Sequence, residues 1–470
     1  MERLRNLFFS HALIFLIILG FIVSVWRIWE DKIYFTDELL IEDAAFAFSK
    51  GEWFINPTVN HNVDLVKPPL VYWTDSVPYF FSRATPFTRR ISNVFFGLGT
   101  VLFVYLLAER FYQSKVAALA SVLLFTNGLY LLFVKTANFD LPAAFFSCAA
   151  LYFYNTEKKT GSFAKTPFFI ALSVLARSFL GLVILVVVLF DNFLNSKRRI
   201  GESLKIIGLT LLFVLPWHVA SFIVSPQSFV NDYLKFATYG HGLQGLAGEV
   251  PTTPFFYFKI FLLFPLGVFG VYYLVKNHKD KKLGFQLLAW LTISFLVLSV
   301  SKTRHEWYAV PLMVPLAISS SVQIQLALEK LKNKKINLVL FKVALLTAVL
   351  TYPVFFFFKL PDDLDIIKAA RFMQGYSGLN GVLYEWRDSY LTQTRFFPGY
   401  NLQVLLPDEL PEKIVNKKTL YLLVNKKYTD EFKYADSLKI YDQGDYNIYL
   451  LKDINSCSTL GFCIGPGGGN

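Results

Sequence analysis

Long apolar runs separated by short polar segments fill the first three quarters of the chain. An apolar run of about 20 residues is long enough to cross the hydrocarbon core of a membrane as an α-helix. The first run covers residues 7–25 and follows Arg3 and Arg5, with no small-residue cleavage site after it. This pattern indicates a retained membrane span, and the later runs predict about eleven crossings in total.

Clusters of Lys and Arg occupy alternate loops, as expected for loops on the cytoplasmic side. This alternation places the N-terminus inside the cell and sets the order of the crossings. After the first, the expected crossings cover residues 91–107, 116–134, a run that begins after Asp140, two short segments within 166–195, then 204–224, 255–275, a run that ends at 300, a run that follows Tyr308, and 338–358.

Positive residues flank the apolar run 166–195 on both sides, with Lys165 before it and Lys197 after it. A single crossing would leave one flank outside, against the positive-inside rule. We therefore expect two short crossings that turn at residues 176–178, each shorter than the usual ~20 residues. Arg177 would then face protein at this turn, where it is expected to play a structural role by satisfying the backbone of a broken helix.

From Lys359 onwards the composition becomes that of a soluble protein. Residues 365–373 predict a helix, whereas 419–424 and 447–451 are dense in β-branched, Leu and Tyr residues and predict strands. An odd number of crossings places this part outside the cytoplasm. The chain is thus expected to be an α-helical polytopic membrane protein with a small extracytoplasmic α/β C-terminal domain. The expected parts are a transmembrane catalytic domain (1–358), the α/β domain (359–455) and a flexible tail (456–470).

Composition excludes other classes of protein. Of the 470 residues, 54% are hydrophobic, which is too many for a soluble globular fold. The net charge of +12 does not indicate nucleic-acid binding, because the basic residues form short clusters between apolar runs. The expected location is the inner (plasma) membrane, in contact with its lipids.

Cysteines are few. Cys148 lies in an apolar run and is expected to be an inert core thiol. Cys457 and Cys463 form a close pair near the C-terminus. Outside the cytoplasm they could form a disulfide, and two free thiols in the tail are an equally good interpretation.

The loop after the first span, residues 27–90, carries the most informative polar residues. Asp37 and Glu38 are adjacent carboxylates close to the membrane, and Lys67 follows on the same loop. Charged groups this close to hydrocarbon are unfavourable unless they have a function. The alternative is that the two acids begin a helix, where carboxylates suit the positive end of the dipole. A short interfacial helix is expected on each side of Lys67.

Further polar side chains lie in loops that this topology places on the same, non-cytoplasmic side. Carboxylates that face cations at a membrane surface suit a reaction on a lipid-linked phosphate. The cations bind the phosphate, and a carboxylate takes a proton from the acceptor, which is worth ~10²–10⁴-fold in rate. The residues concerned are Asp64, Lys135, Asp140, Asp232, His241, Glu249, Lys302, Arg304, His305 and Tyr308.

The motifs in these loops resemble those of GT-C membrane glycosyltransferases. The first loop carries Asp37-Glu38 and then Lys67-Pro68-Pro69-Leu70-Val71-Tyr72-Trp73. This order is similar to the first-loop motif of the branch that contains aminoarabinose transferases and protein mannosyltransferases. Asp140 resembles the second acidic position of that branch, and residues 302–315 resemble its later outer-loop motif. The matches occur in family order and are specific together.

The resemblance implies an inverting transfer of a sugar from an undecaprenyl- or dolichyl-phosphate donor to an acceptor on the outer face. The acceptor would be a lipid A-like lipid, a protein or a glycan. Asp37 would be the general base, with Glu38 beside it, and Asp140 would assist the base or position the acceptor. Lys67 would bind the donor phosphate. The other residues expected in the site are Lys302 and Arg304, which would help Lys67, and Tyr72, His241 and Tyr308, which would line the cavity.

Two departures from the family pattern affect these expectations. Some members have Glu before the Lys-Pro-Pro motif, where this chain has Val66, which weighs against a divalent-metal site built on that glutamate. The Arg that usually follows the outer-loop His is not apparent after His241. The sequence contains no nucleotide-phosphate loop and no HExxH or CxxC motif, so it requires no cofactor.

Two other functions remain as alternatives. A ligase or polymerase that uses a polyprenyl-diphosphate glycan would need a more open cavity with more basic residues. A transporter or flippase of lipid-linked sugars would carry charges at mid-membrane and show paired repeats. Here the charges lie mainly at the outer edge, and no repeat is seen.

Overall fold

The structure is a computed structural model of the 470-residue chain. The chain divides into two compact units, Met1–Asp31 with Ala44–Leu360, and Lys32–Asp43 with Pro361–Asn470. The residues described are 2–331 apart from 60, 196–198, 236–254, 278–281 and 303, and then 339, 342, 346, 365, 367–369, 371–372, 383–386, 403–405, 419–426, 437–444 and 446–452.

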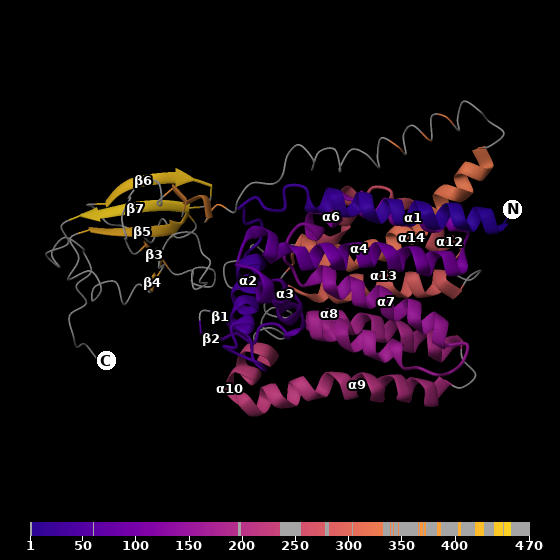
Figure 1. The fold of residues 1–470 in the computed structure, drawn as a ribbon, viewed down its shortest axis with the longest axis horizontal. Helices are drawn as coiled ribbons and strands as arrows, with labels where there is room; N and C mark the ends of the chain where they lie inside the picture. The colour runs from indigo at the N-terminus through magenta and orange to yellow at the C-terminus, as the bar shows by residue number, and fades with distance from the viewer. Residues whose placement is uncertain are drawn as a thin grey trace. The chain divides into compact units, whose positions relative to one another are not determined.

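The first unit is a bundle of apolar helices (Figure 1). Its helices are α1 (Glu2–Val25), α3 (Leu70–Phe81), α4 (Pro86–Phe111), α5 (Ser114–Phe125), α6 (Gly128–Val134), α7 (Asp140–Glu157), α8 (Lys165–Asn195), α9 (Arg199–Val224), α10 (Pro226–Ser228), η2 (Phe256–Lys259), α11 (Ile260–Leu263), α12 (Gly267–Asn277), α13 (Lys282–Val300), η3 (Glu306–Ala309) and α14 (Val310–Leu331). Helix α2 (Thr36–Ser49) begins in the second unit and ends in the first, and β1 (Thr58–Val59) pairs with β2 (Asn62–Val63) in a short antiparallel hairpin.

Among the described residues, five helices are long and apolar enough to cross a membrane, namely α4, α8, α9, α13 and the continuous η3–α14. The expected crossing 116–134 is a bent pair, because α5 and α6 meet at 73°. At this bend Asn127 caps α6 by accepting a hydrogen bond from the Tyr130 backbone amide. These helices establish a polytopic α-helical fold. The expected crossing 338–358 lies almost entirely outside the described residues.

Helix α8 is broken at Arg177 (φ −144°, ψ 29°) and Ser178 (φ 48°, ψ −121°). The contacts on either side of the break show that the chain reverses there. A straight helix would separate residues 166 and 191 by about 38 Å. Both instead contact the last turn of α7: the Thr166 amide donates to Glu157, and Asp191 accepts from Tyr154 at 2.7 Å.

The two limbs of α8 therefore lie side by side as a helical hairpin. A Cβ at Gly181 would lie 2.2 Å from the Ser173 carbonyl oxygen, so only glycine allows the limbs to approach this closely. The first limb also packs on α7, where the Ser147 and Ser173 hydroxyls hydrogen-bond at 2.9 Å. The chain thus turns at residues 176–178, as the positive flanks of this run predicted.

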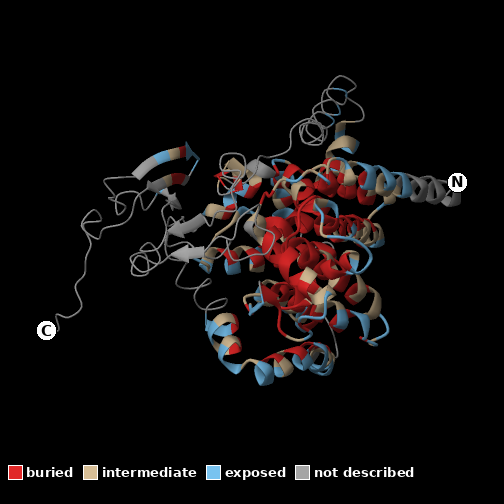
Figure 2. Ribbon diagram, turned by 60° about the vertical axis from the view of Figure 1, so that its left-hand side comes forward, coloured by how far each residue is buried: buried red, intermediate tan, exposed pale blue. Residues whose placement is uncertain are grey.

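The lipid-facing side of the bundle is formed in part by α9. Its outer side chains are apolar and 45–71% exposed, whereas buried residues concentrate in the interior of the bundle (Figure 2). Exposed apolar surface of this size is expected where a helix meets hydrocarbon. Among these exposed residues are Leu211, Leu212, Leu215, Val219, Phe222 and Ile223.

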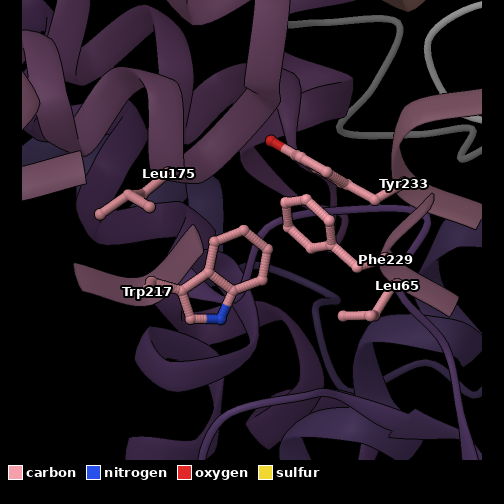
Figure 3. Packing of buried hydrophobic residues seen from close by; sticks show 5 residues of the cluster. All are labelled: Leu65, Leu175, Trp217, Phe229 and Tyr233. Carbon is pink, nitrogen blue, oxygen red and sulfur yellow. The ribbon is translucent and has the colours of Figure 1, made fainter. Parts of the chain in front are cut away.

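A hydrophobic cluster attaches the first loop to the ends of α8 and α9. Leu65 packs with Leu175, Trp217, Phe229 and Tyr233, which come from α8, α9 and the segment after α10 (Figure 3). The Trp217 indole also donates a hydrogen bond of 2.8 Å to a loop carbonyl, at residue 55. These contacts place Lys67, two residues beyond Leu65, at the same end of the bundle as the α8 turn.

The opposite end of α7 is held by polar side chains. The Asp191 carboxylate accepts from Tyr154 and pairs with Lys158, although its side chain is fully buried. Glu157 caps the first turn of α8 by accepting from the backbone amides of residues 164, 165 and 166. These hydrogen bonds and the buried Lys158–Asp191 pair fix the α8 hairpin against α7.

The second unit contains a five-stranded sheet in the order β4-β3-β5-β7-β6. Strands β4, β3 and β5 are parallel, whereas β5, β7 and β6 are antiparallel. The strands expected at 419–424 and 447–451 are confirmed as β5 and β7. The bounds are β3 (Leu383–Trp386), β4 (Gln403–Leu405), β5 (Thr419–Asn425), β6 (Ser437–Gln443) and β7 (Tyr446–Lys452).

Candidate active site

A buried ion pair forms the centre of the candidate site. Asp140 is the first residue of α7 and Arg177 lies at the α8 turn. The Arg177 Nε donates to Asp140 Oδ1 at 2.9 Å, and the two side chains are 5% and 0% exposed. A pair this deeply buried is stable only when its geometry is good, because both charges have left water. The sequence predicted a structural Arg177, and the structure adds its carboxylate partner.

Asp140 is positioned by the short turn before it. The Asn138 side chain caps α7 by accepting from the Leu141 amide at 2.9 Å. Its amide group donates to the carbonyls of Phe133 and Thr136, both at 2.9 Å. Asn93 of α4 also donates to the Thr136 carbonyl. Because these hydrogen bonds hold the segment before α7, Asp140 enters the helix in a fixed direction.

Aromatic rings surround the ion pair. The Arg177 guanidinium lies 4.7 Å from the centre of the Tyr308 ring and 5.8 Å from that of Phe139. Such contacts stabilise a cation over the face of a ring. The Tyr72 ring in turn packs perpendicular to Phe139 at 5.4 Å, and Trp53 packs on Tyr72 at 6.3 Å. Three of the predicted residues, Asp140, Tyr72 and Tyr308, are therefore brought together through Arg177 and Phe139.

The outer-loop motif 302–308 approaches the pair through its last residue, Tyr308. His305 stacks on Trp307 with 4.2 Å between ring centres. Arg304 donates to the Ser299 carbonyl at 2.8 Å, which fixes its side chain at the end of α13. Lys302 is exposed. Of the two cations predicted to assist Lys67, Arg304 is thus the one that is held in a defined position.

Tyr257 is a residue that the sequence analysis did not identify. It lies in η2 and is 2% exposed, and its hydroxyl lies near Tyr308 and within electrostatic range of Asp140 and Arg304. One tyrosine among many in an aromatic-rich chain carries no signal that sequence inspection could have used.

Lys67 is half-buried in a tight segment of the first loop. The Asp64 carboxylate accepts from the Val66 amide at 3.0 Å, which forms an Asx turn just before the lysine. Pro68 and Pro69 follow it and are buried, and Pro69 precedes α3. The backbone around Lys67 is thus rigid, as a group that binds an anion requires.

Asp37 and Glu38 occupy the first turn of α2, where the helix dipole favours carboxylates. Glu38 is fully buried and accepts from the Tyr34 amide at 3.3 Å, whereas Asp37 is half-exposed. The other end of the helix is anchored by Phe46, whose ring packs on Tyr79 of α3. Both the capping role and a catalytic role are compatible with this placement, and Asp37 is the more accessible acid.

Lys135 is buried and has a structural contact. Its ammonium donates to the Trp26 carbonyl at 2.7 Å and so ties α6 to the end of α1. Burial, with the nearby charges of Arg27 and Arg90, lowers the pKa of Lys135 to about 8. Cys148, expected to be inert, is buried as a free thiol.

His241 and Glu249 lie outside the described residues, as do Cys457 and Cys463. Within the part of the chain that the structure describes, no three His, Cys, Asp or Glu side chains come together as metal ligands would. The described centre of the site around Arg177 contains its ion pair with Asp140 and the rings of Tyr308 and Phe139.

Residues 14–228 match the family model described as dolichyl-phosphate-mannose-protein mannosyltransferase. A transferase of Shewanella sediminis, named undecaprenyl phosphate-alpha-4-amino-4-deoxy-L-arabinose arabinosyl transferase, is 28% identical over 65% of this chain and 58% of its own length. An uncharacterized protein of Aquifex aeolicus is 26% identical over 72% of this chain and 68% of its own. The chain thus spans little more than half of the named transferase.

Solved structures with a similar fold include ArnT from Cupriavidus metallidurans bound to undecaprenyl phosphate. It has a TM-score of 0.68 and 13% identity, over 96% of this chain and 99% of that one. The archaeal oligosaccharyltransferase AglB of Archaeoglobus fulgidus follows with a TM-score of 0.58 and 12% identity, over 96% of this chain and 75% of that one. At these identities the likeness concerns the fold. Taken with the sequence relatives, it shows that the chain is similar in fold and sequence to membrane glycosyltransferases of the aminoarabinose-transferase type.

Proposed function

We propose that the chain transfers a sugar, with inversion, from a polyprenyl-phosphate-linked donor to an acceptor on the outer face of the inner membrane. The observation that carries this proposal is the buried Asp140–Arg177 pair against the Tyr308 ring, at the bundle end that also carries Lys67. A fixed guanidinium at the membrane edge suits a lipid whose headgroup is a phosphate. The relatives named for undecaprenyl phosphate support the same donor class.

In this reaction an acceptor oxygen or nitrogen attacks the anomeric carbon, and the bond from that carbon to the phosphate oxygen breaks. The electron pair leaves with the phosphate, whose added negative charge Lys67, Arg177 and Arg304 would stabilise. The acceptor's proton passes to a carboxylate. Asp37 is proposed as this base, because Asp140 is already paired with Arg177 and serves to hold it.

The remaining predicted residues take supporting roles. Tyr72 and Tyr308 would line the cavity beside Arg177, His241 would approach from the loop that precedes η2, and Lys302 would attract anions at the rim. Glu38 would hold the first turn of α2 so that Asp37 faces the acceptor. The acceptor is proposed to be a lipid A-like lipid, a protein or a glycan, and the C-terminal unit to lie on the outer side.

The test compares envelope lipids and proteins by mass spectrometry in cells with the chain, without it, and with Asp37→Asn. Glycosyl transfer predicts a new covalent sugar in the first cells. The Asp37→Asn variant should lower its formation roughly 10²–10⁴-fold while still binding undecaprenyl phosphate. Unchanged transfer by Asp37→Asn would exclude Asp37 as the base. If the sugar stays on its polyprenyl carrier in every strain, a flippase is favoured instead.

A further inference from the structure

Tyr257 carries a buried hydroxyl that the proposed reaction has not yet used. It lies in η2, which packs against η3, the helical turn that contains Tyr308. The two turns are also joined at their surface, where the Lys259 ammonium lies 3.6 Å from the Glu306 carboxylate. Tyr257 therefore reaches the candidate site from a different segment of the chain than the motif 302–308.

The surroundings of this hydroxyl are those of the buried ion pair. The charges of Asp140 and Arg304 both act on it, and the His305 backbone amide approaches its oxygen. Its side chain is 2% exposed, so water does not surround it. The hydroxyl therefore belongs to the same polar cluster as Asp140 and Arg177.

The hydroxyl has no hydrogen-bond partner of normal geometry in the part of the chain that the structure describes. Since the amide that approaches it is a donor, the phenolic proton is the group that lacks an acceptor. Buried polar groups in folded proteins are nearly always hydrogen-bonded, and an exception calls for an explanation, of which a bound ion or ligand at a functional site is one. The missing partner must accept a hydrogen bond, and the nearby guanidinium groups favour one that is anionic.

We propose that the Tyr257 hydroxyl donates a hydrogen bond to a phosphate oxygen of the ligand bound beside Arg177 and Arg304. This inference rests on the proposed function and adds a neutral donor to a set of cations. A hydroxyl suits that position because it stabilises a phosphate without adding a further positive charge next to the two arginines. The contact is made by donor and leaving phosphate alike, so Tyr257 is a binding residue.

The variant Tyr257→Phe removes this one oxygen. It should weaken binding of undecaprenyl phosphate about 10- to 100-fold, as expected for a lost hydrogen bond to a charged group. The thermal unfolding temperature should stay the same or rise, because an unsatisfied hydroxyl leaves the interior. Weaker binding without a lower unfolding temperature distinguishes a role in ligand binding from a structural role.

Tyr130→Phe is the matched control. Tyr130 is also fully buried, but its hydroxyl donates to the Gly97 carbonyl at 2.7 Å, inside the bundle. This variant should lower the unfolding temperature and leave undecaprenyl phosphate affinity unchanged. If Tyr257→Phe instead behaves like Tyr130→Phe, the hydroxyl is structural and the inference is wrong.

Binding is measured on the full chain in detergent with three probes: undecaprenyl phosphate, undecaprenol and inorganic phosphate. The inference predicts that Tyr257→Phe lowers the affinity for undecaprenyl phosphate and for inorganic phosphate, and leaves the affinity for undecaprenol unchanged. Equal affinity of wild type and Tyr257→Phe for undecaprenyl phosphate overturns it and leaves the proposed function intact. A wild-type protein that binds undecaprenol as tightly as undecaprenyl phosphate overturns the phosphate site itself, and with it the inference.

Discussion

Arg177 is a charged residue within an apolar segment, and its contacts explain how it is accommodated there. An arginine inside an apolar run would be expensive in lipid, but here the chain reverses at that residue and turns its side chain onto Asp140 and Tyr308. The guanidinium is planar and can bind a carboxylate and stack on a ring simultaneously. Arg177 is therefore suited to hold an additional anion without losing its own partners.

The conservative change Arg177→Lys tests this residue. Lysine keeps the charge for Asp140 but loses the planar fork and most of the ring contact, so sugar transfer should fall about 10- to 100-fold. Initial rates of transfer in membrane vesicles measure the effect. Arg110→Lys serves as control, since Arg110 contacts the Asn155 carbonyl at the other end of α7. Equal rates for wild type and Arg177→Lys would exclude a role in the reaction.

Asp75 of α3 is a buried acid outside the pair. It is 1% exposed, and its carboxyl oxygens have no hydrogen-bond partner among the described residues. Burial raises the pKa of Asp75 to about 8, an effect that the nearby Ser92 and Thr74 side chains only partly offset. The folded state therefore binds a proton that the unfolded state has released between about pH 4 and pH 8.

It follows that the free energy of unfolding falls as the pH rises from about 4 to 8, by at most about 1.4 kcal/mol per pH unit from this group. Asp75→Asn mimics the neutral acid and should flatten this dependence. Thermal unfolding at pH 5 and pH 8 measures it: the variant should gain most over wild type at pH 8. An equal gain at both values would mean that Asp75 does not titrate in this range.

At the scale of elements, the α8 hairpin decides where the site can form. Its two limbs are short, and its turn places Ser178 at a positive φ of 48°, which is strained for any residue with a Cβ. Neighbouring side chains stabilise this strained turn. Ser178 interacts with the Tyr233 hydroxyl, which in turn lies 2.9 Å from the His218 ring nitrogen Nε2. The turn is thus braced from α9 and the segment that follows it.

Ser178→Gly and Ser178→Ala form a matched pair, since both remove the hydroxyl and only glycine removes the Cβ. At this φ the glycine variant should be the more stable by about 1–2 kcal/mol. In an ordinary helix the order is reversed, because alanine is then favoured by about 1 kcal/mol. Unfolding temperatures in detergent decide between the two. A more stable alanine variant would contradict the observed turn conformation.

At the scale of the molecule, the site is assembled from segments far apart in the chain. The start of α7, the turn of the α8 hairpin and the start of η3–α14 lie at the same end of the bundle. They bring together residues 72, 140, 177, 257 and 308. No single helix contains more than one of them. Ligand binding there should therefore stabilise the folded bundle as a whole.

Undecaprenyl phosphate at 100 times its dissociation constant should stabilise the folded protein by about 2.7 kcal/mol and raise its unfolding temperature. Scanning fluorimetry in detergent measures the shift. Undecaprenol should give a smaller shift, because only the phosphate interacts with Arg177 and Lys67. Equal shifts from the two lipids would show that the protein recognises the chain of the lipid alone.

Much of this arrangement is encoded locally and could be read from the sequence. Apolar length predicted most of the helices, and the positive flanks of 166–195 predicted the reversal there, because these patterns depend on each segment by itself. The run 255–275 was expected as one crossing, but it is divided into η2, α11 and α12. The strands at 419–424 and 447–451 followed from the same kind of local pattern. Asp140, Tyr72 and Tyr308 were identifiable from motifs, and the structure brings these three together.

Other features depended on tertiary contacts. Composition marks Arg177 as unusual, but only the packing of α8 on α7 gives it Asp140 as partner. Tyr257 is one of 25 tyrosines, and its hydroxyl is distinguished by what surrounds it in space. The sequence by itself determined which segments are helical and which polar groups lie at their ends, since these depend on neighbours along the chain. The tertiary structure decided which of those groups meet, because ion pairs and ring contacts are short-ranged and join residues distant in sequence.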